Sequence, residues 1–382
     1  MTEPMNGYEY LKQLAERKEA EKHSFQDFYL YLDDKARKKG IPIHGTFELT
    51  PLCNFDCKMC YVHLTKAQMV ERPLLTVEQW KDLIHQAWEA GLMRATLTGG
   101  ECLTYPGFKE IYLYLRNLGC EISVLTNGSL IDEEWIRFFQ ENKPLIIQIT
   151  LYGENEEVYE KVTGKRSFTK VTENIRLMLE KELPVIISVT PNKYMGKDVF
   201  ETIRLGKSFG KGVQVNNFLM NPRTETGRSG QHDDLDIGLY AKIWKLLDEK
   251  KEDTIKEIPE HSLPPIGGPV HECDLCGLEC SGGRSGFNID WKGTMHPCNL
   301  FTYVESYPLK IGFAEAWKQI NQVVESWPRV PECEGCAYSS VCSKCAARML
   351  QYVKPGKQPV PMCEEIRYLV QHGAWHIPDC DK

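Results

Sequence analysis

The chain has 382 residues, of which 42% are hydrophobic and 26% are charged, a composition typical of a globular protein with room for more than one domain. A net charge of −7 gives no basic field for nucleic acid or anionic lipid, and no apolar run reaches the ~18 residues that a membrane span needs. The N-terminal stretch is charged and lacks the apolar core of a secretion signal, so we expect a cytoplasmic protein that contacts neither nucleic acid nor membrane.

A short charged helix (9–22) comes first, and we expect it to pack across the fold rather than to bind a partner. Strand and helix signals then alternate from about residue 41 to 220. The β-rich segments lie at 45–51, 95–100, 121–128, 144–153, 184–191 and 212–219. The helical segments lie at 78–91, 107–119, 132–140, 167–181 and about 198–208. This alternation predicts parallel βαβ units, and the apolar run at 144–153 predicts a strand buried on both faces.

Several of these strands end in small or polar residues. The tips are Thr98–Gly99–Gly100, Thr126–Asn127–Gly128, Thr150 and Pro191–Asn192. Each is also an ordinary turn sequence. Ligands in parallel α/β folds gather at the carboxyl ends of strands, so four such tips together predict a binding rim.

The composition of the sequence changes after residue 220. A polar connector is followed by a helix at about 235–250 and a charged stretch, and cysteines and glycines dominate from Cys273 onward. The 15 cysteines are odd in number and many form C-x2-C pairs, which in a reducing compartment indicates metal ligation rather than disulfides. Buried structural thiols are the alternative for isolated cysteines such as Cys120.

The segment CNFDCKMC supplies three thiols, Cys53, Cys57 and Cys60, without a fourth cysteine nearby. Thiolates select soft metals. Structural zinc takes four ligands, so a zinc site here would need a distant one such as His63. Three thiolates suit a four-iron cluster whose fourth iron binds something else, and this interpretation is favoured.

The C-x3-C-x2-C spacing after a first strand, followed by the aromatic Tyr61, resembles the signature of the radical S-adenosylmethionine (SAM) family. TGGE (98–101), LTNG (125–128) and ITLYG (149–153) fall where that family has its strand-tip motifs. The resemblance implies a partial (β/α)6 TIM-type barrel and a 4Fe–4S cluster whose open iron chelates SAM. It also implies a set of SAM contacts: Tyr61 with adenine, Gly99, Gly100 and Glu101 with the amino group, Asn127 and Asn192 with ribose or carboxylate, and Thr150 with the methionine moiety.

In that family the reduced cluster cleaves SAM to methionine and a 5′-deoxyadenosyl radical, which abstracts a hydrogen atom from the substrate. The resemblance therefore implies an oxygen-sensitive oxidoreductase that takes electrons from a donor such as ferredoxin or flavodoxin. The cofactor carries the chemistry and the protein positions it.

The C-terminal cysteines form a second pattern, in CSGGRSGFNIDWKGTMHPC (280–298), CEGCAYSSVCSKC (333–345) and Cys363. This pattern resembles the SPASM extension of radical SAM enzymes, although its last gap is two residues instead of three. The resemblance implies two auxiliary 4Fe–4S clusters, and a pair of zinc ribbons is the alternative. The first cluster would use Cys280, Cys298, Cys345 and one of Cys273 or Cys276. The second would use Cys333, Cys336, Cys342 and Cys363.

These features predict a small cysteine-rich iron–sulfur domain after the α/β barrel. The expected divisions are an N-terminal helical extension (1–40), the radical SAM barrel (41–230), a helical linker (231–271) and the SPASM domain (272–382).

We expect the substrate to be a peptide or protein, modified by crosslinking or epimerisation, with a separate leader-binding protein as a possible partner. The alternative is a small molecule: a haem precursor, an amino sugar or a cofactor precursor. Sulfatase maturation is disfavoured, because related maturases carry an aspartate base after the cysteine that matches Cys298, and here Asn299 cannot take a proton. An electron carrier is a third interpretation, against which the open coordination site and the TGGE motif argue.

Overall fold

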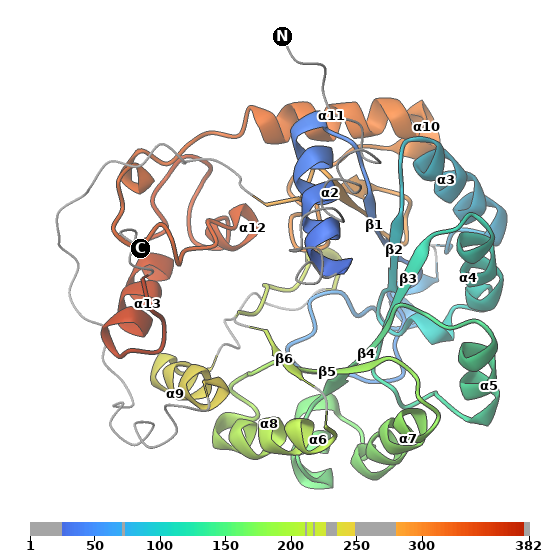
Figure 1. The fold of residues 1–382 in the computed structure, drawn as a ribbon, viewed down its shortest axis with the longest axis horizontal. Helices are drawn as coiled ribbons and strands as arrows, with labels where there is room; N and C mark the ends of the chain where they lie inside the picture. Colours follow the sequence, from blue (N-terminus) through green and yellow to red (C-terminus); the bar gives the residue numbers. More distant parts are fainter. Residues whose placement is uncertain are drawn as a thin grey trace, which may run out of the picture.

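The computed structural model describes residues 25–70, 73–210, 212–216, 218–226, 235–248 and 280–377. Its centre is an eight-stranded sheet with the order β6-β5-β4-β3-β2-β1-β7-β8, curved into an open barrel (Figure 1). The strands are β1 (His44–Glu48), β2 (Arg94–Thr98), β3 (Glu121–Thr126), β4 (Ile146–Leu151), β5 (Val185–Val189), β6 (Val213–Val215), β7 (Gly286–Ile289) and β8 (Met295–His296). Neighbouring strands from β6 to β7 are parallel, and β8 pairs antiparallel with β7. The expected partial barrel is therefore confirmed.

The helices of the barrel follow their strands and cover its outer face (Figure 1). The described helices before residue 250 are α2 (Phe25–Lys39), α3 (Val77–Glu89), α4 (Phe108–Asn117), α5 (Glu133–Glu141), α6 (Glu156–Thr163), α7 (Phe168–Glu180), α8 (Val199–Ser208) and α9 (Ile237–Leu247). Side chains of Thr76, Asp132 and Asn155 cap three of these helices by accepting backbone N–H groups of the first turn. The short α6 is an element that the sequence pattern did not predict.

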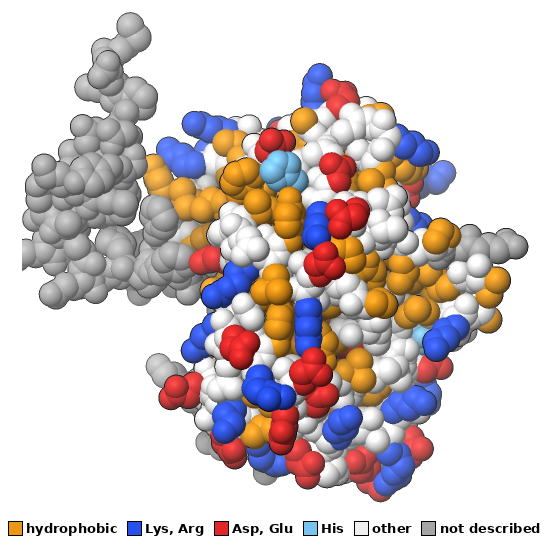
Figure 2. Space-filling view, turned by 90° about the vertical axis from the view of Figure 1, so that its right-hand side faces the viewer, with side chains coloured by type: hydrophobic (Ala, Val, Ile, Leu, Met, Phe, Trp, Pro, Cys, Tyr) orange, Lys and Arg blue, Asp and Glu red, His pale blue; other side chains and the backbone are white. Residues whose placement is uncertain are grey.

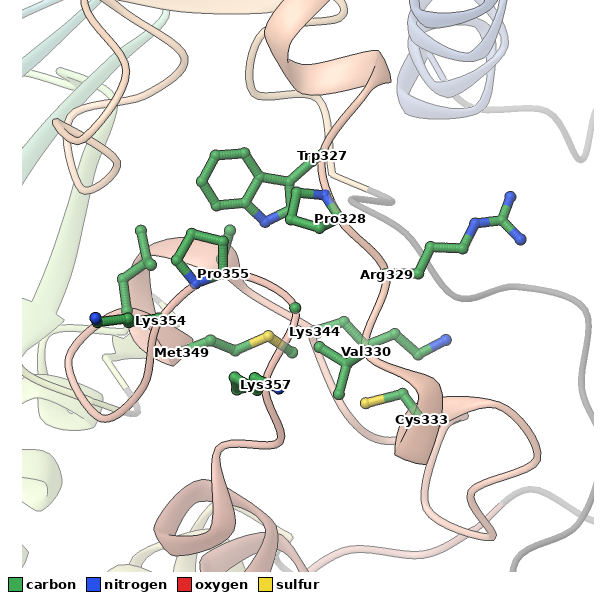
Figure 3. A pocket seen from close by; sticks show the side chains of 13 residues that line it. Trp327, Pro328, Arg329, Val330, Cys333, Lys344, Met349, Lys354, Pro355 and Lys357 are labelled. Atoms are coloured by element: carbon green, nitrogen blue, oxygen red, sulfur yellow. The ribbon is translucent and has the colours of Figure 1, made fainter.

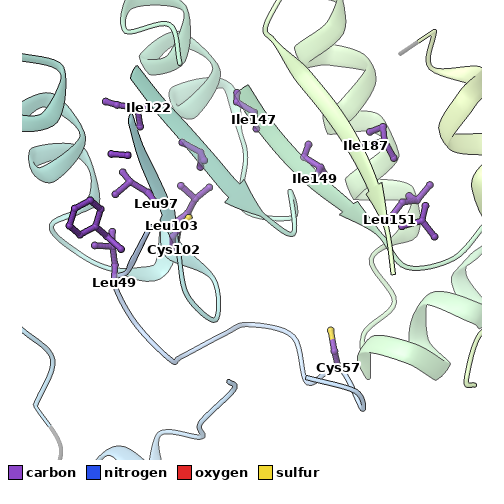
Figure 4. Close-up of a cluster of buried hydrophobic side chains, with 14 of the residues drawn as sticks. Leu49, Cys57, Leu97, Cys102, Leu103, Ile122, Ile147, Ile149, Leu151 and Ile187 are labelled. Carbon is purple, nitrogen blue, oxygen red and sulfur yellow. The ribbon is translucent and has the colours of Figure 1, made fainter. Parts of the chain in front are cut away.

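The two faces of the sheet differ in polarity. Side chains that face the helices, such as Leu97, Ile147 and Ile149, are fully buried and form the main core (Figure 4). The alternate positions face the barrel interior, and along β4 they are only half-buried, so the expectation of a strand buried on both faces is wrong. Register places Thr150 beside Ser188 of β5 on this inner face. The core thus holds the barrel from outside and leaves polar positions inside it.

The C-terminal part of the chain is tied into the barrel. Strand β7 pairs with β1, so residues expected to lie in a separate domain continue the barrel sheet. The remaining helices are α10 (Pro308–Ile311), α11 (Phe313–Glu325), α12 (Ala346–Met349) and α13 (Val360–Gln371). The α11 residues Phe313 and Trp317 donate backbone and indole N–H groups to Gln86 of α3 and to the Gly40 carbonyl. Loops around α12 and α13 form a separate lobe at the open side of the barrel (Figure 1).

Some predictions fall outside the described residues, namely the helix at 9–22, Cys273, Cys276 and most of the 231–271 linker. Within that linker, α9 agrees with the helix expected at about 235–250. No helix in the described ranges is both long and apolar enough to cross a membrane.

Candidate functional site

The three-cysteine loop starts where β1 ends and is held against the tip of β2. The Leu49 N–H donates to the Thr98 carbonyl at 2.9 Å, and the Gly100 N–H donates to the Thr50 carbonyl at 2.7 Å. The Glu101 N–H then donates to the Leu52 carbonyl at 2.9 Å. These backbone bonds place the start of the loop at the carboxyl end of the sheet.

Two glycines allow this close backbone approach. A Cβ added at Gly99 would lie 2.3 Å from the Thr50 carbonyl oxygen, and one at Gly100 would lie 2.4 Å from that of Leu52. Gly99 also has a φ of +146°, which favours glycine. The TGGE segment therefore has a structural task beside its expected contact with SAM, since it seats the loop that carries the cysteines.

The thiols of Cys53, Cys57 and Cys60 lie near enough to one another for their charges to interact. Burial raises the pKa of Cys53 to about 12, and a negative charge on Cys60 would raise it further. Burial also raises the pKa of Cys57 well above its usual range, with charges on Cys60 and Cys53 acting in the same direction. These thiols therefore stay protonated on their own, and a bound metal group would have to offset the cost of ionising them.

The donor set fits an iron–sulfur cluster. Among the described residues, no three His, Cys, Asp or Glu side chains converge on a point where they could share one metal ion. His63, the suggested fourth zinc ligand, instead directs Nδ1 toward Asp56 Oδ1 at 3.2 Å. Because His63 is turned toward Asp56, the three sulfur donors lack the fourth ligand suggested for zinc and suit an iron–sulfur cluster instead.

A polar network from the tip of β3 surrounds Cys53. Asn127 Nδ2 donates to Asn54 Oδ1 at 2.9 Å and lies 3.8 Å from the Cys53 sulfur. Ser129 Oγ donates to Asn127 Oδ1 and accepts from Asn54 Nδ2. The Phe55 N–H donates to the same sulfur at 3.3 Å. Asn127, expected at ribose or carboxylate, thus supports the cysteine loop directly.

Glu101 lies beneath this network with only 1% of its surface exposed. Its carboxylate accepts from Thr126 Oγ1 and from the Asn127 N–H, both at 2.8 Å, and from the Leu103 N–H at 3.1 Å. Burial nevertheless raises the pKa of this carboxyl. In this structure the side chain joins the tips of β2 and β3.

Two other expected SAM contacts lie at separate strand tips. Thr150 is half-buried on the inner face of β4. Asn192 is fully buried, and its Oδ1 accepts the Tyr194 and Met195 N–H groups of its own loop. Both lie at carboxyl ends of strands, as the tip pattern predicted.

Tyr61 connects the cysteine loop to the C-terminal region. Its hydroxyl accepts from Asn299 Nδ2 at 3.1 Å, and its ring lies 5.5 Å from the Arg223 guanidinium. Arg223 forms two 2.7 Å hydrogen bonds to Glu48 and one of 2.9 Å to the Asn299 carbonyl. Burial alone would lower the pKa of Arg223, but the Glu48 carboxylate raises it above the usual range. One buried ion pair therefore joins β1, the cysteine loop and the C-terminal region.

These residues line a cavity of about 360 Å³ at the barrel mouth, which we call the mouth pocket and define by Tyr61, Arg223, Asp290, His296 and Asn299. His296 approaches Asp290 Oδ2 at 3.5 Å, and its Nδ1 lies 3.0 Å from the Val304 carbonyl.

Lys292 lies 3.3 Å from both Asp290 and Glu225. Lys292 and Glu225 also line a neighbouring cavity of about 440 Å³ with Pro73 and Trp291. The two hollows therefore lie side by side, with Lys292 and Glu225 common to both.

The C-terminal cysteines form two groups. A thiolate on Cys345 or Cys280 would raise the pKa of Cys298, which burial already brings to about 12. The second group is Cys336, Cys342 and Cys363, where burial and the first two thiols raise the pKa of Cys363 to about 11. A charge on Cys336 would raise the pKa of Cys342, and a charge on Cys280 would raise that of Cys345, so the two nearby thiols have different neighbours; the crossed ligation itself stays a prediction.

Three further cysteines lie in the part of the chain that the structure describes. Cys333 lies in the same lobe and lines a separate small hollow. Cys102, just after the carboxyl end of β2, and Cys120, just before β3, are buried and direct their thiols to the Leu125 and Leu92 carbonyls. These two match the description of structural thiols.

Sequence reasoning missed Glu48, Arg223 and Asp290. Glu48 left a signal, because it is a lone acid ending an apolar strand, and a buried acid implies a buried cation. Arg223 left none, because it lies in a polar connector 175 residues away.

The family model and the relatives that this chain matches agree with the sequence motifs described above. Residues 47–206 match the model of the radical SAM superfamily. The "AdoMet-dependent heme synthase" of Methanosarcina barkeri is 24% identical, over 83% of this chain and 95% of that protein. The "antilisterial bacteriocin subtilosin biosynthesis protein AlbA" of Bacillus subtilis is 26% identical, over 80% of this chain and 67% of that protein. The structure of Streptococcus suis SuiB bound to the precursor peptide SuiA has a similar fold, with a TM-score of 0.63 at 14% identity over 93% of this chain and 88% of that one.

Proposed function

This chain is a radical SAM enzyme with a SPASM-type C-terminal domain, and from that premise we propose that it abstracts a hydrogen atom from a peptide or protein segment held in the mouth pocket. A 4Fe–4S cluster and SAM, when bound, supply the 5′-deoxyadenosyl radical. Cys53, Cys57 and Cys60 would hold the cluster, and the rim formed by Gly99, Gly100 and Thr150 would receive SAM.

The observation that carries the proposal is the shape and position of the groove. The mouth pocket starts at Tyr61, next to Cys60, and continues past Lys292 and Glu225 to Trp291. A hollow that begins at the cluster loop and runs outward over two joined cavities fits an extended chain better than a compact molecule.

The charge of the mouth pocket favours a peptide over a haem precursor as the substrate. Its acids are Asp290, Glu225 and Glu305, whereas its two cations are already engaged, Arg223 by Glu48 and Lys292 by Asp290 and Glu225. A tetrapyrrole that carries several carboxylates would meet an excess of negative charge here. The alternative substrate is therefore a neutral or basic small molecule, and the similarity to a haem synthase is the observation that keeps the small-molecule class in view.

The remaining assignments are part of the same proposal. The crossed groups Cys280–Cys298–Cys345 and Cys336–Cys342–Cys363 would hold two auxiliary clusters, with Cys333 completing the second. Reduction would come from a small electron-transfer protein such as ferredoxin or flavodoxin.

The test uses anaerobically reconstituted protein with dithionite and SAM. We expect 5′-deoxyadenosine in the parent protein and none in Cys57→Ala, which loses a cluster thiol; an equal yield from both would contradict the proposal.

The substrate class is tested with peptides and with porphyrin precursors in heavy water. A crosslinked peptide would lose a pair of hydrogens and an epimerised one would gain deuterium, as read by mass spectrometry. Modification of the porphyrin precursors alone would overturn the peptide assignment.

A further inference from the structure

The C-terminal lobe carries a second hollow, which we call the lobe pocket and define by Trp327, Arg329, Met349, Lys354 and Lys357 (Figure 3). Its volume is about 30 Å³, which is room for the end of one side chain. Trp327 and Val330 lie at its apolar wall together with Met349, Leu350 and two prolines. The hollow lies outside the mouth pocket.

The charged side chains around the lobe pocket are all basic. Arg329, Lys354 and Lys357 are exposed, and Lys344 is a fourth cation in the lining. None of the three exposed cations forms an ion pair with any residue that the structure describes. The charge around this pocket is therefore positive, although the net charge of the chain is −7.

The outer face of the barrel shows the contrast. There, acidic and basic side chains are interspersed (Figure 2). Lys81 pairs with Glu110, Lys109 with Glu134, and Arg204 with Glu201. The lobe pocket differs in that cations without any acid line one apolar hollow, an arrangement that attracts an anionic ligand with an apolar part.

The lobe pocket also adjoins the mouth pocket. Leu350 lines both of them, and Met349 and Gln351, its neighbours, line one pocket each. A chain bound in the lobe pocket therefore needs only a short extension to reach the site of hydrogen abstraction.

We propose that the lobe pocket anchors an acidic peptide segment, which inserts one apolar side chain between Trp327 and Met349 while its carboxylates pair with Arg329, Lys354 and Lys357. A hollow of this size favours a flexible segment, because a folded acidic protein presents a broad surface rather than one protruding side chain. The inference rests on the proposed function in that the anchored segment belongs to the substrate chain.

The binding test uses the holoprotein and a fluorescein-labelled peptide of alternating glutamate and leucine, without SAM or reductant. Fluorescence anisotropy should show binding that weakens with added salt. Reversing the three cations (R329E, K354E and K357E together) should raise Kd about tenfold, since each lost pair contributes modestly and repulsion is added. The matched control reverses Lys81, Lys109 and Arg204, changes net charge equally, and should leave Kd within about twofold.

A second measurement locates the apolar contact. The peptide should change the intrinsic fluorescence of the parent protein, and W327F should lose most of that change although the other seven of the chain's eight tryptophans remain.

Equal Kd in the pocket and control triple variants would overturn the proposal. So would unchanged peptide binding combined with slower reduction by flavodoxin in the pocket variant, because the cations would then serve a protein electron donor. The pocket variant should keep its uncoupled 5′-deoxyadenosine formation. Peptide binding without any SAM cleavage in the parent would instead contradict the proposed function and leave the anchor standing.

Discussion

The pair formed by Arg223 and Glu48 offers the sharpest test of how the barrel mouth is held together. Both N–O distances are 2.7 Å, and the two side chains are only 8% and 3% exposed. Replacing Arg223 with methionine leaves the Glu48 carboxylate buried without a cation. Removing one partner of a buried ion pair costs about 3–5 kcal/mol, because the remaining charge keeps its desolvation penalty. We therefore expect R223M to lower the free energy of unfolding by that amount.

The assay is urea unfolding of cofactor-free protein under reducing, anaerobic conditions. R204M is the matched control, because Arg204 and its partner Glu201 are 47% and 61% exposed, and exposed pairs contribute only about 0.2–1 kcal/mol. The double variant R223M/E48Q should be more stable than R223M alone, since it removes the orphaned charge as well. An R223M cost no larger than that of R204M, or a double variant less stable than R223M, would refute the reasoning.

Three further predictions concern the site. G100A should lose most of its reconstituted iron, because the new Cβ would lie 2.4 Å from the Leu52 carbonyl, whereas G212A, which meets nothing within 4 Å, should retain it. N127A should lower the midpoint potential of the cluster in an EPR-monitored titration, because it removes a donor near the Cys53 sulfur; an unchanged potential would count against that contact. Burial would raise the pKa of Asp290, but His296 and Lys292 lower it, so its contribution to stability is present above about pH 4 and is lost as pH falls. D290N should accordingly be less stable than the parent at about pH 7, and the difference should shrink as pH falls below about 4; a difference that stays constant with pH would exclude this role.

Local features of the site were predictable from the sequence because their signals are local. The C-x3-C-x2-C loop, the glycines after β2 and the polar tip of β3 each lie within a few residues, and turn chemistry together with strand periodicity places them on one rim. The crossed ligation predicted for Cys342 and Cys345 comes only from the resemblance to a known family, because spacing alone cannot say which of two nearby thiols joins which cluster.

Contacts between distant segments were not predictable. Three such contacts join residues more than 70 positions apart: the pairing of β7 with β1, the Asn127 contact to Cys53 and the ion pair of Arg223 with Glu48. Single-sequence periodicity reports which face of an element is apolar, but it does not report which polar side chain will meet that element's tip. The polar inner face of β4 was missed for a related reason: Ile147, Ile149 and Leu151 made the segment look apolar throughout, although Gln148 and Thr150 alternate with them on the inner side.

The two hollows place a joint constraint on any peptide that spans them. Glu48 neutralises Arg223, so the mouth pocket is left with the acids Asp290, Glu225 and Glu305 around a single lysine, while the exposed cations Arg329, Lys354 and Lys357 of the lobe pocket form no ion pair with a described residue. Because Leu350 lines both hollows, a peptide bound in them must change from acidic to neutral or basic character over a short length. A uniformly acidic peptide would bind in the lobe pocket and be repelled at the mouth, so binding and turnover should separate in a series of peptides whose acidic residues are moved stepwise toward the reacting end. Turnover that tracks affinity throughout that series would show that the two pockets do not hold one chain.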